Sequence, residues 1–419
     1  MNNQNFDVIV VGGGTSGMLA ALSAAQNGAR VALLEKNKRL GKKLLLTGGG
    51  RCNVTNAKSP EEILRHIPNG NKFLYSAFSQ FNNYDIIKLF VDNGVPLKEE
   101  DHGRLFPVTN RSKTIVDTLT SLLEKHQVTC YFEVAVSAIC VNNGEVTGVR
   151  LINQQTLNAR AVILATGGKT YRYTGSTGDG YEFAKRLNHS ITPLYPTEVP
   201  LCSNDRFIKK DQLQGVSLQG VTLAVLNEKN KKLVSHRMDL LFTHFGLSGP
   251  AALRCSSTVV KLLKTQEVVL LTLDFFPDSS LNDLVKHLKE IAKNTPLKTI
   301  KNGLKTWLPE RLLIYLIHEL AIKESLSLKQ ILDKDWQRLA ALSKNFVIHI
   351  NGTWPLDKAF VTGGGISLKE VNPKTMASKH VHGLFFCGEL LDINGYTGGY
   401  NITAAFVTGY VAGKGAAEL

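Results

Sequence analysis

The residues with the clearest chemical meaning are three glycines near the start of the chain. Gly12, Gly14 and Gly17 fit the spacing G-x-G-x-x-G between a β-branched run, Phe6–Val11, and an alanine-rich segment, Met18–Asn27. This spacing allows a tight turn, a close approach of backbone N–H groups to a pyrophosphate, and close packing of a helix on a strand. The N–H groups and the positive end of the helix dipole then stabilise the phosphates. The loop predicts a dinucleotide site formed by Gly12, Gly13, Gly14, Thr15, Ser16 and Gly17.

An acidic residue lies where such a site needs one. A second buried strand, Val31–Leu34, ends at Glu35, which follows Gly17 by eighteen residues. A carboxylate at this strand end accepts hydrogen bonds from the two hydroxyls of an adenosine ribose, and it would repel a 2′-phosphate. We therefore expect adenosine at Glu35, with Lys36 beside it. Because the strand, turn, helix and acidic strand end occur together, this signal is stronger than glycine spacing alone.

A second glycine loop, Thr47–Asn56 (TGGGRCNVTN), follows the acidic strand end. Its glycines permit close approach to an extended cofactor, and its polar side chains supply donors for phosphate and other polar cofactor atoms. The alternative is a polar surface loop with a glycine turn. The residues expected to contact the cofactor here are Lys43, Thr47, Gly50, Arg51, Cys52 and Asn53.

Two later segments have the same character. Ala161–Ala165 is a strand that enters Thr166-Gly167-Gly168, and Val381–Cys387 is expected to be a buried strand that ends at Gly388-Glu389. The run from Gly395 then opens a helix of small residues. A flavin that accepts hydride gains negative charge at its N1–C2=O edge, which a helix N-terminus stabilises. The alternative is a purely structural helix cap. Glu389 or Asp392 would bond the ribityl hydroxyls. The further cofactor contacts expected are Val134, Ala165, Thr166, Gly167, Gly388, Glu389, Asp392, Gly399, Tyr400, Asn401 and Ile402.

The elements that must position these residues follow a recognisable order. Strand, helix and strand are followed by a helix over Ile115–His126 and a hairpin that turns at Asn142-Asn143-Gly144. This order is typical of flavoproteins with two glycine motifs. After residue 190 prolines and alternating strands replace it, and a helical pattern runs over about residues 280–342. We expect an FAD-binding domain in two parts, residues 1–190 and 356–419, interrupted by an inserted β-rich and helical domain, residues 191–355.

Composition limits the class of protein. The chain has 419 residues, 43% hydrophobic and 20% charged, as in ordinary globular proteins of two or three domains. Val8–Ala29 lacks charges, but its glycines and Gln26-Asn27-Gly28 divide it into strand, turn and helix, so we expect neither a membrane span nor a secretory signal. The cysteines show no C-x-x-C and no metal-ligand spacing, so we expect free thiols, no metal and a cytoplasmic location. They are Cys52, Cys130, Cys140, Cys202, Cys255 and Cys387.

The net charge of +14 and the pI near 9.4 raise the question of a nucleic-acid partner. The charges are dispersed, and the densest cluster, Lys286–Lys305, contains six Lys and one Glu. Leu284, Leu288 and Ile291 give this segment an apolar helical face, so the lysines fit the solvent-exposed face of an amphipathic helix. The pattern therefore argues against nucleic acid and favours a small-molecule substrate.

Four stretches carry a family resemblance. They are Gly41–Asn56 (GKKLLLTGGGRCNVTN), Phe242–Pro250 (FTHFGLSGP), Phe360–Ile366 (FVTGGGI) with Asn372–Met376 (NPKTM), and Cys387–Asp392 (CGELLD) through Asn401. Together they resemble the BaiN-like flavoproteins, a family of NAD(P)/FAD-dependent oxidoreductases and aminoacetone oxidase family enzymes. The resemblance spans nearly the whole chain. It implies noncovalent FAD in a glutathione-reductase-type Rossmann domain, with a β-barrel-like and helical insert. Its members are linked to the reduction of unsaturated steroid-like ketones and to the oxidation of aminoacetone.

The function expected from the residues and the resemblance is hydride transfer through flavin N5 to or from a small organic substrate. No second G-x-G-x-x-G opens another βαβ unit, so NAD(P)H, if it is the donor, must dock transiently. The alternatives are an amine oxidase that uses oxygen, an FAD-dependent RNA-modifying protein, and a redox sensor that holds FAD without turnover.

Two residues are candidates for contact with the substrate. His244 is the one group of its loop that titrates near neutral pH, and it would donate a proton as hydride arrives. Arg104 would hold a carbonyl or carboxylate group. The alternative for His244 is a histidine satisfied by backbone carbonyls in a turn that joins domains.

Overall fold

The computed structural model describes residues 5–210 and 212–419, and it divides into two compact units. The first unit comprises residues 1–195 and 356–419, and the second comprises residues 196–355. Each unit has its own apolar core.

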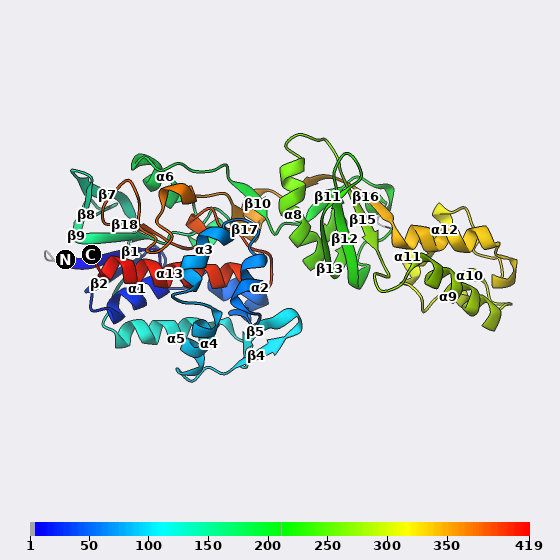
Figure 1. Ribbon diagram of the computed structural model, residues 1–419, viewed down its shortest axis with the longest axis horizontal. Helices are drawn as coiled ribbons and strands as arrows, with labels where there is room; N and C mark the ends of the chain where they lie inside the picture. Colours follow the sequence, from blue (N-terminus) through cyan, green and yellow to red (C-terminus); the bar gives the residue numbers. More distant parts are fainter. Residues whose placement is uncertain (1–4, 211) are drawn as a thin grey trace. The chain divides into compact units, whose positions relative to one another are not determined.

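A seven-stranded sheet forms the centre of the first unit, in the order β6-β2-β1-β9-β8-β7, with β18 beside β9 (Figure 1). The pairs β1–β2, β1–β9, β2–β6 and β9–β18 are parallel, and the hairpin strands are antiparallel. Parallel strands are covered on both faces, which explains the continuous apolar run of β1. The strands of the sheet are β1 (Asn5–Val11), β2 (Val31–Glu35), β6 (Thr129–Phe132), β7 (Val136–Asn142), β8 (Glu145–Leu151), β9 (Thr156–Leu164) and β18 (Leu384–Phe386).

Other elements of this unit surround the sheet or connect its parts. A small sheet consists of β3 (Thr55–Asn56), β5 (Arg104–Pro107) and β4 (Leu97–Glu100). Two short strands, β10 (Tyr195–Thr197) and β17 (Val361–Gly363), are close in sequence to the two points where the chain passes from one unit to the other. The helices are α1 (Thr15–Gln26), α2 (Pro60–Arg65), α3 (Asn71–Phe78), α4 (Asn83–Val91), α5 (Ser112–Lys125), α6 (Asp179–Arg186) and α13 (Tyr400–Ala417).

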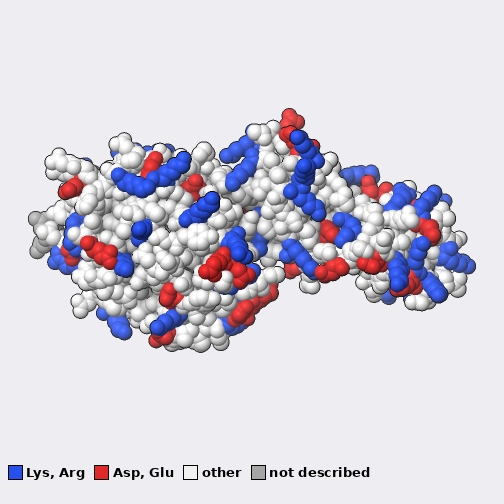
Figure 2. Space-filling model, viewed as in Figure 1, with Lys and Arg blue, Asp and Glu red and all other residues white. Residues whose placement is uncertain are grey.

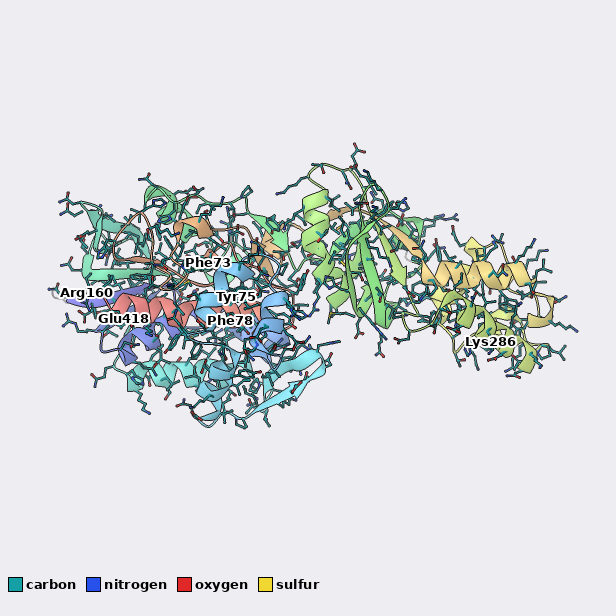
Figure 3. All side chains as sticks on the ribbon, viewed as in Figure 1. Phe73, Tyr75, Phe78, Arg160, Lys286 and Glu418 are labelled. Atoms are coloured by element: carbon teal, nitrogen blue, oxygen red, sulfur yellow. The ribbon has the colours of Figure 1, made fainter. Side chains whose placement is uncertain are left out.

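Helices α1 and α13 pack against each other more closely than ordinary side chains allow (Figure 1). A Cβ atom on Gly409 would lie 2.3 Å from the carbonyl oxygen of Ser16, and one on Gly413 would lie 2.1 Å from that of Ala20. At the far end of α13, the Arg160 guanidinium donates to the Ala417 carbonyl at 3.4 Å, and Figure 3 shows Arg160 and Glu418 at this same end. The small residues of α13 therefore fix where its N-terminus lies relative to that of α1.

A closed six-stranded barrel, β11-β14-β13-β12-β15-β16, forms the core of the second unit. Its strands are β11 (Leu201–Ser203), β12 (Ser217–Leu226), β13 (Lys232–Phe242), β14 (Gly246–Ser248), β15 (Val269–Asp274) and β16 (Phe346–Thr353). Its helices are α7 (Arg206–Lys209), α8 (Pro250–Leu262), α9 (Leu281–Asn294), α10 (Ile300–Gly303), α11 (Glu310–Glu319) and α12 (Asp333–Lys344). The predicted fold class, a Rossmann domain with a barrel-like and helical insert, is confirmed.

One predicted strand is wrong at its start. The sequence predicts a strand over Val381–Cys387, but β18 begins only at Leu384. The chain turns before it, because the Leu384 N–H bonds the Val381 carbonyl at 3.4 Å and Gly383 has a φ of +79°. A Cβ on Gly383 would lie 2.4 Å from the carbonyl oxygen of Arg160, so this turn needs glycine.

Within the described part of the chain, no helix combines the length and apolar character that a membrane crossing requires. All six cysteines are free thiols, and burial raises the pKa of both Cys52 and Cys387 to about 12. These two thiols are therefore inert near neutral pH, although both lie beside the predicted cofactor loops.

Candidate functional site

The glycine loop between β1 and α1 is built as the spacing predicts. A Cβ on Gly17 would lie 1.8 Å from the carbonyl oxygen of Gly12, and a Cβ on Gly12 would lie 2.6 Å from that of Ala165. Gly14 differs from both, because a Cβ there would meet no described atom within 4 Å. Two glycines of the motif are thus required by the protein's own backbone, whereas Gly14 borders open space.

The N-terminus of α1 faces the same open space. No described side chain caps it, and its first turn contains no acidic residue. The first N–H groups of a helix have no partner within the helix, and they carry the positive end of its dipole. An uncapped N-terminus beside a glycine that leaves room for a ligand fits a bound pyrophosphate.

Glu35, at the end of β2, is buried and holds the glycine loop in place. One carboxylate oxygen accepts the Gly13 N–H at 2.8 Å, and the other accepts the backbone and side-chain N–H groups of Asn37 at 2.8 and 2.6 Å. The Val134 N–H bonds the Glu35 carbonyl at 3.1 Å, which brings another predicted contact residue here. Lys36 points elsewhere, because its ammonium group bonds Thr177 and Asp179 at 2.5 and 2.7 Å.

Replacing Glu35 with Gln is expected to weaken FAD binding by about 10- to 100-fold, because each lost charge-assisted hydrogen bond is worth about 1.5–3 kcal/mol. Gln keeps one oxygen for the Gly13 N–H but loses the two hydrogen bonds from Asn37, so circular dichroism verifies that the variant folds. Equilibrium titration of FAD into the apoprotein measures the change. Unaltered affinity in a folded variant would show that Glu35 does not bind the ribose.

The second glycine loop lies against the start of α13. In the orientation that satisfies both ends of its amide, Asn53 accepts the Gly399 N–H at 2.8 Å and donates to the Thr55 carbonyl at 2.9 Å. The hydroxyls of Thr55 and Thr403 lie 2.7 Å apart. These contacts bring the two predicted segments together at the N-terminus of α13, whose first turn contains no acidic residue.

Within the second glycine loop, Gly50 is exposed and has a φ of +85°. The Thr47 carbonyl accepts the N–H of the buried Cys52 at 3.0 Å. The Arg51 guanidinium bonds Glu100 at 2.8 Å and lies over the Phe106 ring, 4.2 Å from its centroid. Arg51 is therefore already paired within the protein.

Two side chains at the start of α13 already have partners within the protein. The Asn401 side chain both accepts the Gly395 N–H and donates to the Gly395 carbonyl, each at 2.7 Å. Tyr400 is buried, with its ring stacked on His66 at 4.6 Å. The Asn401 amide thus closes the preceding loop, and the backbone N–H groups of Tyr400, Asn401 and Ile402 form the end of the helix.

Glu389 is held by an ion pair inside the first unit. Lys43 Nζ lies 2.6 Å from its carboxylate, which also accepts the Thr362 N–H at 2.8 Å and lies 3.4 Å from the Thr170 hydroxyl. Burial favours a higher pKa, but Lys43 and Thr362 outweigh it, so the pKa of Glu389 lies below its usual value. Its neighbour Asp392 accepts the Asn69 side-chain N–H at 2.5 Å.

The loop after β9 passes beside the first glycine loop. The Ala165 N–H bonds the Val11 carbonyl at 2.9 Å, and Gly167 has a φ of +72°. Thr166 Oγ1 is buried, with no hydrogen-bond partner among the described residues. Close to these residues, a Cβ on Gly388 would lie 2.3 Å from Ser16 Oγ, so the chain after β18 touches α1. The predicted cofactor segments therefore form one connected region of the first unit.

This region fits FAD. The open space at Gly14, the uncapped N-terminus of α1 and the orphaned Thr166 hydroxyl are features that a dinucleotide with polar linking groups would complete. Glu35 adds the carboxylate that a ribose needs.

The two candidate substrate contacts lie in different units. Arg104 belongs to β5 of the first unit, where its guanidinium bonds Asp101 and lies 5.6 Å from the Phe106 ring centroid. His244 belongs to the second unit, in the turn between β13 and β14, and is exposed beside the Phe245 ring. Their catalytic roles stay predictions.

Sequence reasoning missed the residues that support these contacts. Asn37 holds Glu35, Asn69 holds Asp392, and Thr170 and Thr362 hold Glu389. Asn37 lies only two residues from Glu35, so local spacing offered a signal for it. The other three pairs join distant parts of the chain, and no local pattern indicates them.

Comparison with known proteins identifies the family. The chain matches the HI0933-like protein Rossmann domain over residues 6–415. It is 33% identical to the ribosomal RNA dihydrouridine synthase of Escherichia coli (strain K12), over 98% of each chain. It is 30% identical to the 3-dehydro-bile acid delta(4,6)-reductase of Clostridium scindens, again over 98% of each chain.

Two solved structures share the fold. The 3-ketosteroid delta1-dehydrogenase from Sterolibacterium denitrificans has a TM-score of 0.54 at 13% identity and covers 99% of both chains. Mycobacterium smegmatis Sdh1 in complex with UQ1 has a TM-score of 0.52 at 19% identity, covering 100% of this chain and 69% of that one. The resemblance to BaiN-like flavoproteins is confirmed: the chain belongs to the HI0933-like family and is an FAD-dependent oxidoreductase.

Proposed function

We propose that this oxidoreductase reduces a carbon–carbon double bond conjugated with a carbonyl group, with NAD(P)H as the hydride donor. The observation that carries the proposal is the chemistry in the names of two relatives that span the chain. A delta(4,6)-reductase of a 3-dehydro-bile acid and a dihydrouridine synthase both saturate a double bond next to a carbonyl. Such a bond accepts hydride at its electron-poor carbon and a proton at the carbon beside the carbonyl.

The residues of the first unit would hold the cofactor by contacts of defined chemistry. Gly14 and the first N–H groups of α1 would bind the pyrophosphate, and Glu35 would accept the ribose hydroxyls. Lys43 would keep Glu389 ionised beside the ribityl chain. When bound, FAD supplies the N5 atom that carries hydride from donor to substrate.

The N-terminus of α13 would place backbone N–H groups at the pyrimidine edge of the flavin ring. Helix dipoles and fixed N–H donors stabilise negative charge most strongly where water is excluded. Asn53 and the Thr55–Thr403 pair would keep this end of the helix in position.

Anaerobic stopped-flow measurement at the flavin absorption band tests the hydride donor. We expect NADH or NADPH to reduce the FAD-loaded protein rapidly. The competing interpretation, an amine oxidase, predicts reduction by aminoacetone and no reduction by either nicotinamide. That second result would overturn the reductase proposal.

Replacing His244 with Asn is expected to lower turnover about 10²-fold or more, because a positioned proton donor contributes about 10²- to 10⁴-fold. The imidazole would protonate the substrate carbon beside the carbonyl, and Asn cannot supply that proton. His287, an exposed histidine of α9 in the same unit, provides the matched control as His287→Asn. Turnover that is equal in both variants, at unchanged FAD occupancy, would remove His244 from the mechanism.

A second candidate substrate is a uridine within ribosomal RNA. The alignments with the two relatives named for this activity each cover 98% of the relative's chain. The net charge of this chain is +14. On α9, Lys286, Lys289 and Lys293 lie on one face of the helix, together with Glu290. On the face shown in Figure 2, basic and acidic side chains are interspersed. Affinity for RNA would come from lysines such as those of α9, which release counterions when they contact phosphates.

The RNA candidate is tested with unmodified ribosomal RNA transcribed in vitro. Incubation with the FAD-loaded protein and NADPH should yield a nucleoside heavier than uridine by two hydrogens, and RNA retention should fall steeply with salt. An unchanged nucleoside profile, together with reduction of a small unsaturated ketone, would restrict the substrate to small molecules.

A further inference from the structure

Three potential metal ligands meet in the first unit, and no part of the proposed flavin chemistry uses them. His189 follows α6, Glu370 ends the short helical turn Leu368–Glu370, and His380 lies in the turn before β18. His189 Nδ1 lies 3.4 Å from Glu370 Oε2, and His380 Nε2 lies 3.7 Å from the same oxygen. All three ligand atoms lie within 4.8 Å of one another.

The distances suit a small cation. Zinc binds histidine nitrogen and carboxylate oxygen at about 2.0–2.2 Å in a tetrahedron, which places neighbouring ligand atoms about 3.3 Å apart. The separations of 3.4 and 3.7 Å to Glu370 Oε2 are close to that value. The exposed His380 leaves one side of the cluster open to solvent, where water would complete the coordination.

His189 supplies a second, independent observation. Its side chain is fully buried, yet Nδ1 makes no hydrogen bond of good geometry with any described residue, and Glu370 Oε2 faces it at 3.4 Å. Unpaired buried polar atoms are rare and costly, so this nitrogen needs a partner. It points into the space shared with Glu370 and His380.

The donor set is one that zinc accepts. The cluster offers two imidazole nitrogens, from His189 and His380, and one carboxylate oxygen, from Glu370. Histidine nitrogen and carboxylate oxygen are both common zinc ligands.

The surroundings hold the ligands in position. His189 Nε2 lies 2.9 Å from Ser378 Oγ, and this oxygen also accepts the His380 N–H at 3.0 Å, which fixes the turn that carries His380. Glu370 Oε2 accepts the Ser190 N–H at 2.8 Å. The His189 ring packs edge-on against Phe386 of β18 at 4.7 Å. Such outer contacts orient ligands in protein metal sites.

We propose that His189, Glu370 and His380 bind one divalent transition-metal ion of the zinc type. The ion would join the end of α6 to the segment before β18, the strand that leads into Cys387-Gly388. It would act as a structural clamp, separate from hydride transfer.

The test uses FAD-loaded protein freed of metal by a chelator and then titrated with Zn²⁺ alone or Co²⁺ alone. We expect about one ion per chain, visible Co²⁺ absorption bands of a low-coordinate nitrogen and oxygen site, and a Zn²⁺-dependent rise in melting temperature. Glu370→Gln and His380→Ala should each weaken Zn²⁺ binding by about 100-fold or more, since even loss of an outer contact costs about 10- to 100-fold.

His382→Ala provides the matched control, because His382 is an exposed histidine two residues from His380. It should bind Zn²⁺ as the parent chain does. His380 is exposed, so its variant should fold even if the Glu370 variant does not, and circular dichroism verifies each. The proposal is overturned by absent saturable binding in the parent chain, by unchanged binding in His380→Ala, or by equal loss in His382→Ala.

Discussion

Gly14→Ala is expected to leave the protein folded but weaken FAD binding by at least about tenfold, whereas Gly17→Ala should destabilise the first unit. Both variants add the same methyl group. At Gly14 it enters space that no described atom occupies within 4 Å, where the pyrophosphate would lie. At Gly17 it would lie 1.8 Å from the carbonyl oxygen of Gly12.

The magnitudes separate the two variants. Alanine gains roughly 1 kcal/mol over glycine inside a helix, but overpacking against a rigid backbone typically costs about 1–3 kcal/mol or more. We therefore expect Gly17→Ala to lower the free energy of unfolding and Gly14→Ala to leave it within about 0.5 kcal/mol of the parent value. Urea denaturation of the apoproteins and FAD titration measure the two effects. Normal FAD affinity in Gly14→Ala would contradict the assignment of this loop to the pyrophosphate.

Lys43→Met is expected to destabilise the protein by about 3 kcal/mol near neutral pH, because it leaves the Glu389 carboxylate without its cation. The side chains of this pair are only 26% and 20% exposed, so water compensates for little of the loss. The double variant Lys43→Met, Glu389→Gln should recover much of the stability, since it removes the unpaired charge.

The same pair has a defined pH dependence. The pKa of Glu389 is lowered in the folded chain, so its contribution is present above the unfolded pKa of about 4.5 and is lost as pH falls through the folded value. The deficit of Lys43→Met should therefore be largest above about pH 5 and shrink in acid. Urea unfolding across this pH range measures it. A deficit that does not vary with pH, or no recovery in the double variant, would contradict a charge-based role.

The local patterns in the sequence predict the fold well because each segment specifies its own element. The apolar run before Gly12, the small residues after it and the acidic end at Glu35 define one βαβ unit, which the sheet register confirms. The start of β18 was missed because Gly383 turns the chain against Arg160, a residue far away in sequence.

The site is predicted less completely than the fold. Backbone features such as the glycine loop follow from residue type, so their positions could be foreseen. The partners of side chains could not, because Lys43 meets Glu389 and His189 meets Glu370 only after distant segments pack together. The roles of His244 and Arg104 rest on residue chemistry alone.

The oxidative half-reaction tests the central claim most directly. FAD-loaded protein is reduced anaerobically and then mixed with a small α,β-unsaturated ketone, with unmodified ribosomal RNA, or with oxygen, while the flavin absorption band is followed. We predict that the ketone or the RNA reoxidises the flavin faster than oxygen does, and that its double bond is saturated in the product. Reoxidation by oxygen alone, with both double-bond substrates unchanged, would contradict the account.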